Sequence, residues 1–156
     1  MIKQETYLTR EGLKNISAEL EHLRTVRRLE ATQRIQKAKD IGGTADNAEY
    51  EEAKNEQAFV EGRILTLEGM TRNAVLITER TSPSKIVRLG STVTVETGKH
   101  NIQTYVIVGR VEANPSHGKI SNESPVGKAL IGLKAGSTAT VKAPSGTVKF
   151  KVVKVA

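Results

Sequence analysis

The longest helical pattern of the chain begins in residues 9–43, TREGLKNISAELEHLRTVRRLEATQRIQKAKDIGG. Thr9 suits a helix N-cap, and Glu11 in the first turn faces the positive end of the helix dipole. The next apolar residues have the 3-4-3 spacing of one helix stripe, the kind that forms a coiled-coil seam. They are Leu13, Ile16, Leu20 and Leu23. We therefore expect a long helix that starts near residue 9.

The apolar side of this helix continues less regularly towards a pair of glycines. It is carried by Val26, Leu29, Ile35 and Ala38. A slip in the phase of the pattern occurs near Arg27 and Arg28. Gly42 and Gly43 then break the helix, and two adjacent glycines predict a tight turn.

A second helical pattern begins at Asp46 and ends near Thr78. Its apolar residues are Ala53, Val60, Ile64, Leu67 and Ala74. Two long helices around one short loop predict an antiparallel hairpin in which the two apolar stripes bury each other. We assign residues 1–79 to this coiled-coil hairpin domain, with its tip near residues 41–47.

Charge also favours the pairing of these helices. The far part of the first helix is basic, with Arg24, Arg27, Arg28, Arg34, Lys37 and Lys39. The second helix is acidic, with Asp46, Glu49, Glu51, Glu52, Glu56 and Glu61. Ion pairs between exposed side chains contribute only about 0–1 kcal/mol each. We therefore expect these pairs to select the register of the hairpin more than to stabilise it.

The pattern changes from helical to alternating after the segment Thr81-Ser82-Pro83-Ser84-Lys85. Residues 80–156 are predicted to form a second, β-rich domain, and the whole chain an α+β fold. Its predicted strands contain Val93, Val95, Tyr105, Ile107, Val148, Phe150 and Val152. Pro144-Ser145-Gly146 is expected to close a hairpin. A short helix is expected from the N-cap Ser124 and Pro125 to a stop at Gly132.

Composition narrows the classes of function. The 156 residues carry a formal net charge of +7 and no cysteine, which excludes disulfides and thiolate metal sites. Residues 79–156 hold 12 basic and 4 acidic side chains, which favours an acidic partner such as nucleic acid, with solubility as the alternative explanation. We find neither a membrane-spanning run nor a signal peptide, so we expect a cytoplasmic protein.

Acidic residues near the glycine turn are the best candidates for chemistry. Asp46 and Glu49 open the second helix, and Asp40 precedes the turn. Mg²⁺ is commonly held by one or two protein carboxylates, with water or phosphate at its other positions. The spacing of Asp46 and Glu49 also suits a capping box, with Asp46 as N-cap and Glu49 reaching back from the third helical position, and composition alone favours this structural role. Both interpretations stay open.

Several separated segments resemble one protein family. Residues 41–50, IGGTADNAEY, resemble the tip motif of the Gre family of bacterial transcript cleavage factors, in particular its GreA-type members. Other matching segments are residues 61–64 (EGRI), 90–95, 105–109, 124–132 and 144–146. The resemblance covers essentially the whole chain. It implies a coiled-coil hairpin that enters the secondary channel of RNA polymerase and an FKBP-like C-terminal domain that docks at the channel entrance.

The resemblance also implies a mechanism. Tip acids of this family help the polymerase bind a second Mg²⁺ and activate water, so that backtracked RNA is cut by the polymerase, which remains the enzyme. Asp46 corresponds to the second tip acid, whereas Gly43 stands in place of the first, usually Asp. The role would then fall on Asp46, helped by Glu49 or Asp40, and cleavage stimulation would be weakened. The factor has no cofactor of its own beyond Mg²⁺ at the polymerase active site.

Further roles follow from the same resemblance. Ser124 and Pro125 match the polymerase-docking element. Five basic residues would contact phosphates of the RNA 3′ segment: Arg24, Arg27, Arg28, Arg34 and Lys37. Ion pairing of these residues with the second helix is an equal alternative. We expect a monomer.

The sequence leaves three alternative functions. Gly43 keeps open a cleavage-deficient family member that modulates or inhibits RNA polymerase from the same channel. A peptidyl-prolyl isomerase is suggested only by the implied topology, and the second half offers only Tyr105 and Phe150 as aromatic residues for a proline pocket. The third alternative is a free basic RNA- or DNA-binding protein.

Overall fold

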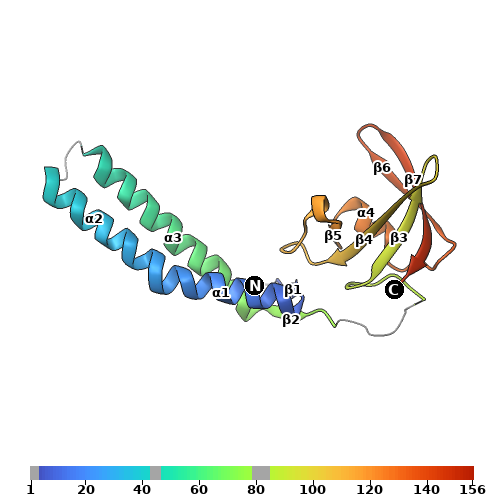
Figure 1. Ribbon diagram of the computed structural model, residues 1–156, viewed down its shortest axis with the longest axis horizontal. Coiled ribbons are helices and arrows are strands. Elements are labelled where there is room, and N and C mark those ends of the chain that lie inside the picture. The colour runs from blue at the N-terminus through green and yellow to red at the C-terminus, as the bar shows by residue number, and fades with distance from the viewer. Residues whose placement is uncertain (1–3, 43–46, 79–84) are drawn as a thin grey trace. The chain divides into compact units, whose positions relative to one another are not determined.

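The computed structural model describes residues 4–42, 47–78 and 85–156 (Figure 1). They divide into two compact units. The first contains residues 13–73, and the second contains residues 4–12 together with those from Ala74 onward. The predicted boundary between residues 79 and 80 lies outside the described residues and stays a prediction. The structure adds that the N-terminal strand groups with the second unit.

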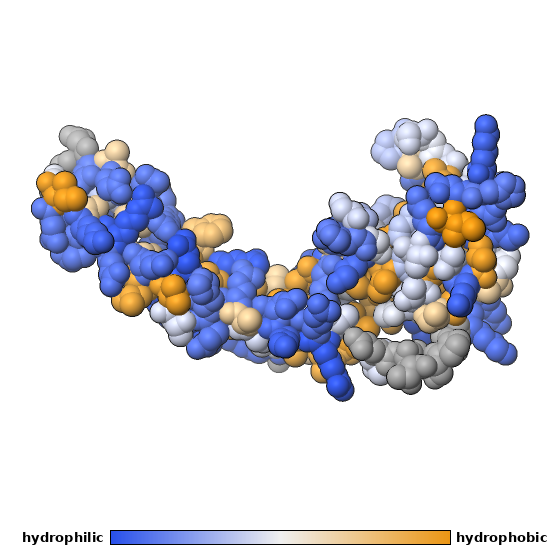
Figure 2. All heavy atoms as spheres, viewed as in Figure 1, coloured by the Kyte–Doolittle hydropathy of each residue, from blue (hydrophilic) through white to orange (hydrophobic). Residues whose placement is uncertain are grey.

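The first unit is an antiparallel helical hairpin. One arm consists of α1 (Arg10–His22, whose first turn belongs to the second unit), a π-helical turn η1 (Leu23–Arg27) and α2 (Arg28–Gly42). The other arm is α3 (Ala48–Arg72). The predicted hairpin is confirmed, although its second helix ends earlier than expected, because Ala74 already lies in a strand. Figure 2 shows hydrophilic side chains over most of the visible face of this unit.

The π-helical turn explains the phase slip in the sequence. The Arg28 N–H donates to the Leu23 carbonyl, five residues back, so this turn holds one residue more than an α-helical turn. The buried positions beyond it are Ala31 and Ala38. Val26 and Leu29 are 39% and 56% exposed, so their predicted place on the apolar side was wrong. The extra residue rotates them away from the seam.

The buried residues of the hairpin change in size along its length. Large aliphatic side chains are buried at its base: Ile16, Leu20, Leu23, Val60, Ile64 and Leu67. In the far part the buried residues of the two arms are the alanines Ala31, Ala38 and Ala53. Because hydrophobic stabilisation scales with the apolar area removed from water, the base of the hairpin contributes most of it.

The second unit contains two sheets. A two-stranded parallel sheet pairs β1 (Thr6–Leu8) with β2 (Ala74–Leu76). A five-stranded sheet has the order β5-β4-β3-β7-β6 and is antiparallel except between β4 and β5. Its strands are β3 (Thr92–Thr97), β4 (Asn101–Val108), β5 (Lys119–Ser121), β6 (Thr138–Ala143) and β7 (Gly146–Val155). A 3₁₀ turn η2 (Pro115–His117) and the helix α4 (Pro125–Leu130) complete the unit.

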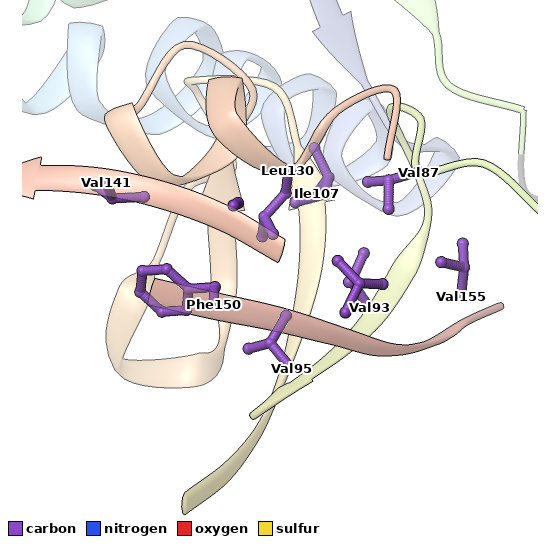
Figure 3. Packing of buried hydrophobic residues seen from close by; sticks show 10 residues of the cluster. Val87, Val93, Val95, Ile107, Leu130, Val141, Phe150 and Val155 are labelled. Atoms are coloured by element: carbon purple, nitrogen blue, oxygen red, sulfur yellow. The ribbon is translucent and has the colours of Figure 1, made fainter. Parts of the chain in front are cut away.

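One face of the five-stranded sheet carries the core of this unit. Val93, Val95, Ile107 and Val152 are buried there, and Leu130 of α4 packs in the same cluster (Figure 3). The two-residue turn that joins β6 to β7 is Pro144-Ser145, as predicted. The α+β fold class expected from the sequence, a helical hairpin followed by a small β-rich domain, is confirmed. In the described part of the chain, no helix is long and apolar enough to cross a membrane.

The N-cap of α1 lies within the second unit, which contains residues 4–12. Thr9 Oγ1 accepts from the Gly12 N–H at 3.0 Å, which confirms the predicted cap. The Glu112 carboxylate in turn accepts from both the Thr9 N–H and the Thr9 hydroxyl, each at 2.6 Å. A residue 103 positions away therefore holds the entry into the helix.

The change in core size along the hairpin predicts a contrast between two leucines of α3. Leu67 is fully buried at the base, whereas Leu65 is 68% exposed. Leu67→Ala should lower the free energy of unfolding by about 2–5 kcal/mol, and Leu65→Ala should change it by no more than about 0.5 kcal/mol. Urea unfolding followed by circular dichroism measures both. Equal effects of the two substitutions would contradict the assigned seam.

Candidate functional site at the far end of the hairpin

The sequence placed the site at the turn between the two arms. Gly43 and Asp46 lie outside the described residues. The structure describes both sides of the turn, since α2 ends at Gly42 and α3 begins at Ala48. Asp40 and Glu49 are exposed on these two sides.

Asn47 joins the two arms at this end. Its side-chain Oδ1 accepts from the Tyr50 N–H at 3.2 Å, so Asn47 is the N-cap of α3. Its Nδ2 donates to the Ala38 carbonyl of α2 at 2.9 Å. One side chain thus satisfies a free amide of one helix and bonds the backbone of the other.

This cap corrects the capping interpretation of the sequence. The N-cap is Asn47, so Glu49 is the second helical residue and not the third, and its carboxylate accepts from Arg34. Asn is among the preferred N-cap residues, so the signal was present one position further along the chain. The start of α3 consequently does not need the Asp46 carboxylate as its cap.

Glu49, the predicted accessory acid, is held by Arg34. Its Oε1 lies 3.3 Å from Arg34 Nη2, while 59% of its side chain remains exposed. Arg34 Nη2 also lies 3.3 Å from Glu52, and Nη1 donates to Glu56 at 2.5 Å. These acceptors raise the pKa of Arg34, with Glu56 as the largest cause. Asp40 Oδ1 accepts a hydrogen bond at 3.0 Å from the side chain of Gln36, which lies on the same helix.

Glu56 is the centre of the polar network between the arms. Its carboxylate accepts from Arg34 at 2.5 Å and from Arg27 at 2.8 Å, and its side chain is only 23% exposed. The pKa of the Glu56 carboxyl is lowered, chiefly by the hydrogen bond from Arg34. This network lies along the part of the hairpin in which the buried residues are alanines. Charged hydrogen bonds therefore join the arms where apolar area is smallest.

The other predicted RNA-contacting arginines are also paired with α3. Arg28 donates twice to Glu61, at 2.7 and 3.0 Å, and Arg24 pairs with Glu68. Lys37 is exposed, and no ion pair joins it to another residue within 4–42, 47–78 and 85–156. The ion-pairing alternative is thus confirmed for the four arginines. A guanidinium has five N–H donors, so pairing leaves donors for phosphate, and RNA contact stays a prediction.

The predicted docking element has the expected local structure. Ser124 Oγ accepts from the Gly127 N–H at 3.0 Å and donates to the Ser121 carbonyl at 2.7 Å. Pro125 occupies the first helical position and is exposed. A Cβ at Gly127 would collide with the Ser121 carbonyl, so this close approach requires glycine. In this corner, which follows β5, Ser124 is half-buried and Pro125 is exposed.

Comparison with known proteins defines the family. Residues 6–76 match the family described as "Transcription elongation factor, N-terminal", and residues 82–156 match "Transcription elongation factor, GreA/GreB, C-term". The chain is 48% identical to "Transcription elongation factor GreA" of Caldanaerobacter subterraneus over 149 residues, 95% of each chain. It is 48% identical over 153 residues to that of Acetivibrio thermocellus, covering 97% of this chain and 96% of the relative.

Among solved structures, GreA factor homolog 1 of Thermus thermophilus is 33% identical with a TM-score of 0.45, covering 98% of this chain and 99% of the other. Both halves of the sequence match the two parts of a single family. This chain therefore belongs to the GreA/GreB family of transcription elongation factors.

The double role of Asn47 predicts different effects for two substitutions. Asn47→Asp keeps an N-cap acceptor but puts a carboxylate against the Ala38 carbonyl, whereas Asn47→Ala removes both bonds. Hydrogen exchange should accelerate at the end of α2 in both variants. At the start of α3 it should accelerate only in Asn47→Ala, where loss of the cap costs about 0.5–2 kcal/mol. Identical exchange in the two variants would contradict the bond between the arms.

The lowered pKa of Glu56 predicts an acid sensitivity. A carboxyl whose pKa is lower in the folded than in the unfolded state stabilises above the unfolded value, and this contribution is lost as the pH falls through the folded value. The thermal midpoint of helix melting should therefore fall between about pH 5 and pH 3. This fall should be smaller in Glu56→Gln.

The control for this measurement is Glu51→Gln. Glu51 is exposed on the same helix and has no ion pair with another residue in the described part of the chain. Its variant should melt with the pH dependence of the unmodified protein. An undiminished acid response in Glu56→Gln would show that the network contributes nothing measurable.

Proposed function

We propose that this protein binds RNA polymerase and stimulates the polymerase's own cleavage of backtracked nascent RNA, which releases arrested complexes. The observation that carries this proposal is the family match over both parts of the chain, residues 6–76 and 82–156. The polymerase supplies the catalytic centre, and this protein is not itself an enzyme. Its site of action is the cytoplasm, and it acts as a monomer.

The shape and polarity of the hairpin support entry into a water-filled channel. With 25 residues, α3 is about 37 Å long, and the hairpin is only two helices wide. Its far part is joined by the network around Glu56 and exposes charged side chains, so it does not depend on burial against another domain. We infer that this end enters the secondary channel of RNA polymerase.

The carboxylates at this end fit a partial contribution to a magnesium site. Within residues 4–42, 47–78 and 85–156, no group of three or more His, Cys, Asp or Glu side chains is placed to hold a metal. Glu49 is engaged by Arg34, and Asn47 serves as the cap. We assign the metal-facing role to Asp46, which corresponds to the second acid of the family's tip motif.

Bound Mg²⁺ in the polymerase active site would supply an activated water for phosphodiester cleavage. In this proposal the Asp46 carboxylate orients that water or completes the ligand set. Glu49 assists through its charge while Arg34 fixes its position. Because Gly43 supplies no carboxylate, stimulation depends on a single tip acid.

The second unit provides the surface that docks on RNA polymerase. Ser124 and Pro125 form the exposed corner that begins α4, and the bonds of Ser124 fix its shape before binding. A preorganised corner loses little conformational entropy on docking. We assign contact with the RNA 3′ segment to the exposed Lys37 and to the N–H donors that remain on four arginines. They are Arg24, Arg27, Arg28 and Arg34.

The alternatives are less well supported. A prolyl isomerase needs an open aromatic pocket, yet Phe150 lies in the core cluster, where it is 8% exposed. A cleavage-deficient channel modulator would bind the polymerase equally well, and it differs from the proposal only in the activity of the tip. The experiment below separates the two.

The proposal predicts the effect of substitutions at the tip. Stalled, backtracked polymerase should cleave its RNA faster with this protein, and Asp46→Ala should return the rate to that of polymerase alone. Gly43→Asp should raise the rate above that of the unmodified protein, because it adds the missing carboxylate. Glu51→Ala, on the exposed side of α3, is the matched control and should leave the rate unchanged.

Binding to the polymerase is measured in parallel for every variant. Binding without cleavage by the unmodified protein would favour the modulator. Cleavage that survives Asp46→Ala would contradict the assigned role of Asp46, and a Gly43→Asp variant with no gain would contradict the two-carboxylate explanation.

A further inference from the structure

The face of the five-stranded sheet opposite the core is open and basic. Along β6 and β7 the buried residues, such as Val141, Phe150 and Val152, alternate with exposed ones. The exposed residues on this outer face are mostly lysine and threonine. They are Thr138, Thr140, Lys142, Thr147, Lys149, Lys151 and Lys154.

Each of these lysines lies opposite a threonine of a neighbouring strand. The pairs in the sheet register are Lys149 with Thr140, Lys151 with Thr138, Lys142 with Thr147, and Lys154 with Thr94. Residues directly opposite in antiparallel strands have Cβ atoms about 5 Å apart. The outer face of β3, β7 and β6 therefore presents four neighbouring sets of an ammonium and a hydroxyl group, and we call it the lysine face.

A β-bulge keeps the last lysine on this face. Thr94 pairs with Lys154 and the next residue, Val95, pairs with Val152, so Val153 is an extra residue in β7. With strict alternation, Lys154 would share the side of Val152 and Phe150. The bulge instead leaves Lys154 exposed while Val155 returns to the core at 7% exposure.

The charge of the lysine face is not balanced within the unit. No ion pair joins Lys142, Lys149, Lys151 or Lys154 to another residue of the described chain. The acidic residue on the adjoining outer part of β3, Glu96, lies opposite Lys151 in the register but bonds His100 Nδ1 at 2.6 Å. The face thus carries four positive charges and one negative charge.

We propose that the lysine face is a contact surface for the phosphate backbone of double-stranded DNA. Lys and Thr side chains both bond phosphate oxygens, and such contacts position a protein without reading sequence. From Lys149 to Lys154 the strand extends about 17 Å, which is about half the length of one helical turn of duplex DNA. This surface is additional to the tip and the docking element.

A duplex fits this surface better than a single strand. Proteins that bind single strands stack the bases on aromatic side chains, and β6, β7 and β3 present none on this face. Phe150 belongs to the buried side, and Tyr105 of β4 lies opposite the buried Val93. Contact through ammonium and hydroxyl groups alone suits the outside of a double helix.

The competing explanation is protection of the sheet edge. β6 is an edge strand, and lysines on edge strands discourage pairing with other chains. That explanation accounts for Lys142 on β6 itself. It does not require Lys149, Lys151 and Lys154, which lie on β7, an inner strand of the sheet.

The test is binding of the full-length protein to a duplex DNA of about two helical turns, measured by fluorescence anisotropy over a series of salt concentrations. The variant replaces the four lysines of the lysine face by glutamine. The control replaces four exposed lysines elsewhere in the chain, and so has the same net charge. They are Lys14, Lys85, Lys99 and Lys134.

If the four lysines contact phosphates, the slope of log K against the logarithm of the salt concentration should become less negative by about 3 to 4 in the variant. It should change little in the control. Equal losses in variant and control would overturn the proposal and leave general charge as the explanation. Absence of duplex binding at low salt would overturn it as well. Tighter binding of a single strand of the same length, with the same lysine dependence, would overturn the choice of a duplex.

Discussion

The far part of the hairpin depends on the carboxylate of Glu56, which accepts hydrogen bonds from both Arg27 and Arg34 on the opposite arm. From this network to the far end the buried side chains of the two helices are the alanines Ala31, Ala38 and Ala53, so little apolar area holds the arms together there. A hairpin end surrounded by water is not stabilised by a wide exposed apolar stripe, and the partly exposed charged hydrogen bonds around Glu56 join the arms without one. The base, with its large aliphatic residues, stabilises the hairpin, and the network fixes how the arms continue beyond it.

The position of the chemical groups follows from this constraint. The π-helical turn at Leu23–Arg27 rotates the seam so that Arg27 and Arg34 face α3. Asn47 then closes the end by bonding both arms. Beside the turn, Asn47 bonds both arms and Glu49 is paired with Arg34. The proposed chemistry is therefore assigned to Asp46. In the second unit, Ser124 fixes the local structure of the docking corner. The bulge at Val153 keeps Lys154 on the outer face of the sheet, away from the core.

Much of this arrangement could be predicted from local patterns. Thr9, Ser124 and Pro125 take the predicted cap and first-turn positions, because these signals act within four residues. The phase slip near Arg27 was visible, but its structural consequence was not, since the same spacing fits an irregular α-helix that buries Val26 and Leu29. Asp and Asn both suit an N-cap, so the local pattern does not decide between Asp46 and Asn47. The parallel pair β1 and β2 was missed because three-residue strands 68 positions apart leave no periodic signal.

The proposed function requires the far end of the hairpin to reach the active site of RNA polymerase. A photo-crosslinking residue at Ala48, the exposed first residue of α3, tests it most directly in backtracked complexes. A second probe at Leu65, exposed near the base, is the comparison. We expect the probe at residue 48 to crosslink to the RNA 3′ end and the probe at residue 65 not to do so. Crosslinking to RNA from neither position, in complexes shown to contain the protein, would contradict the account.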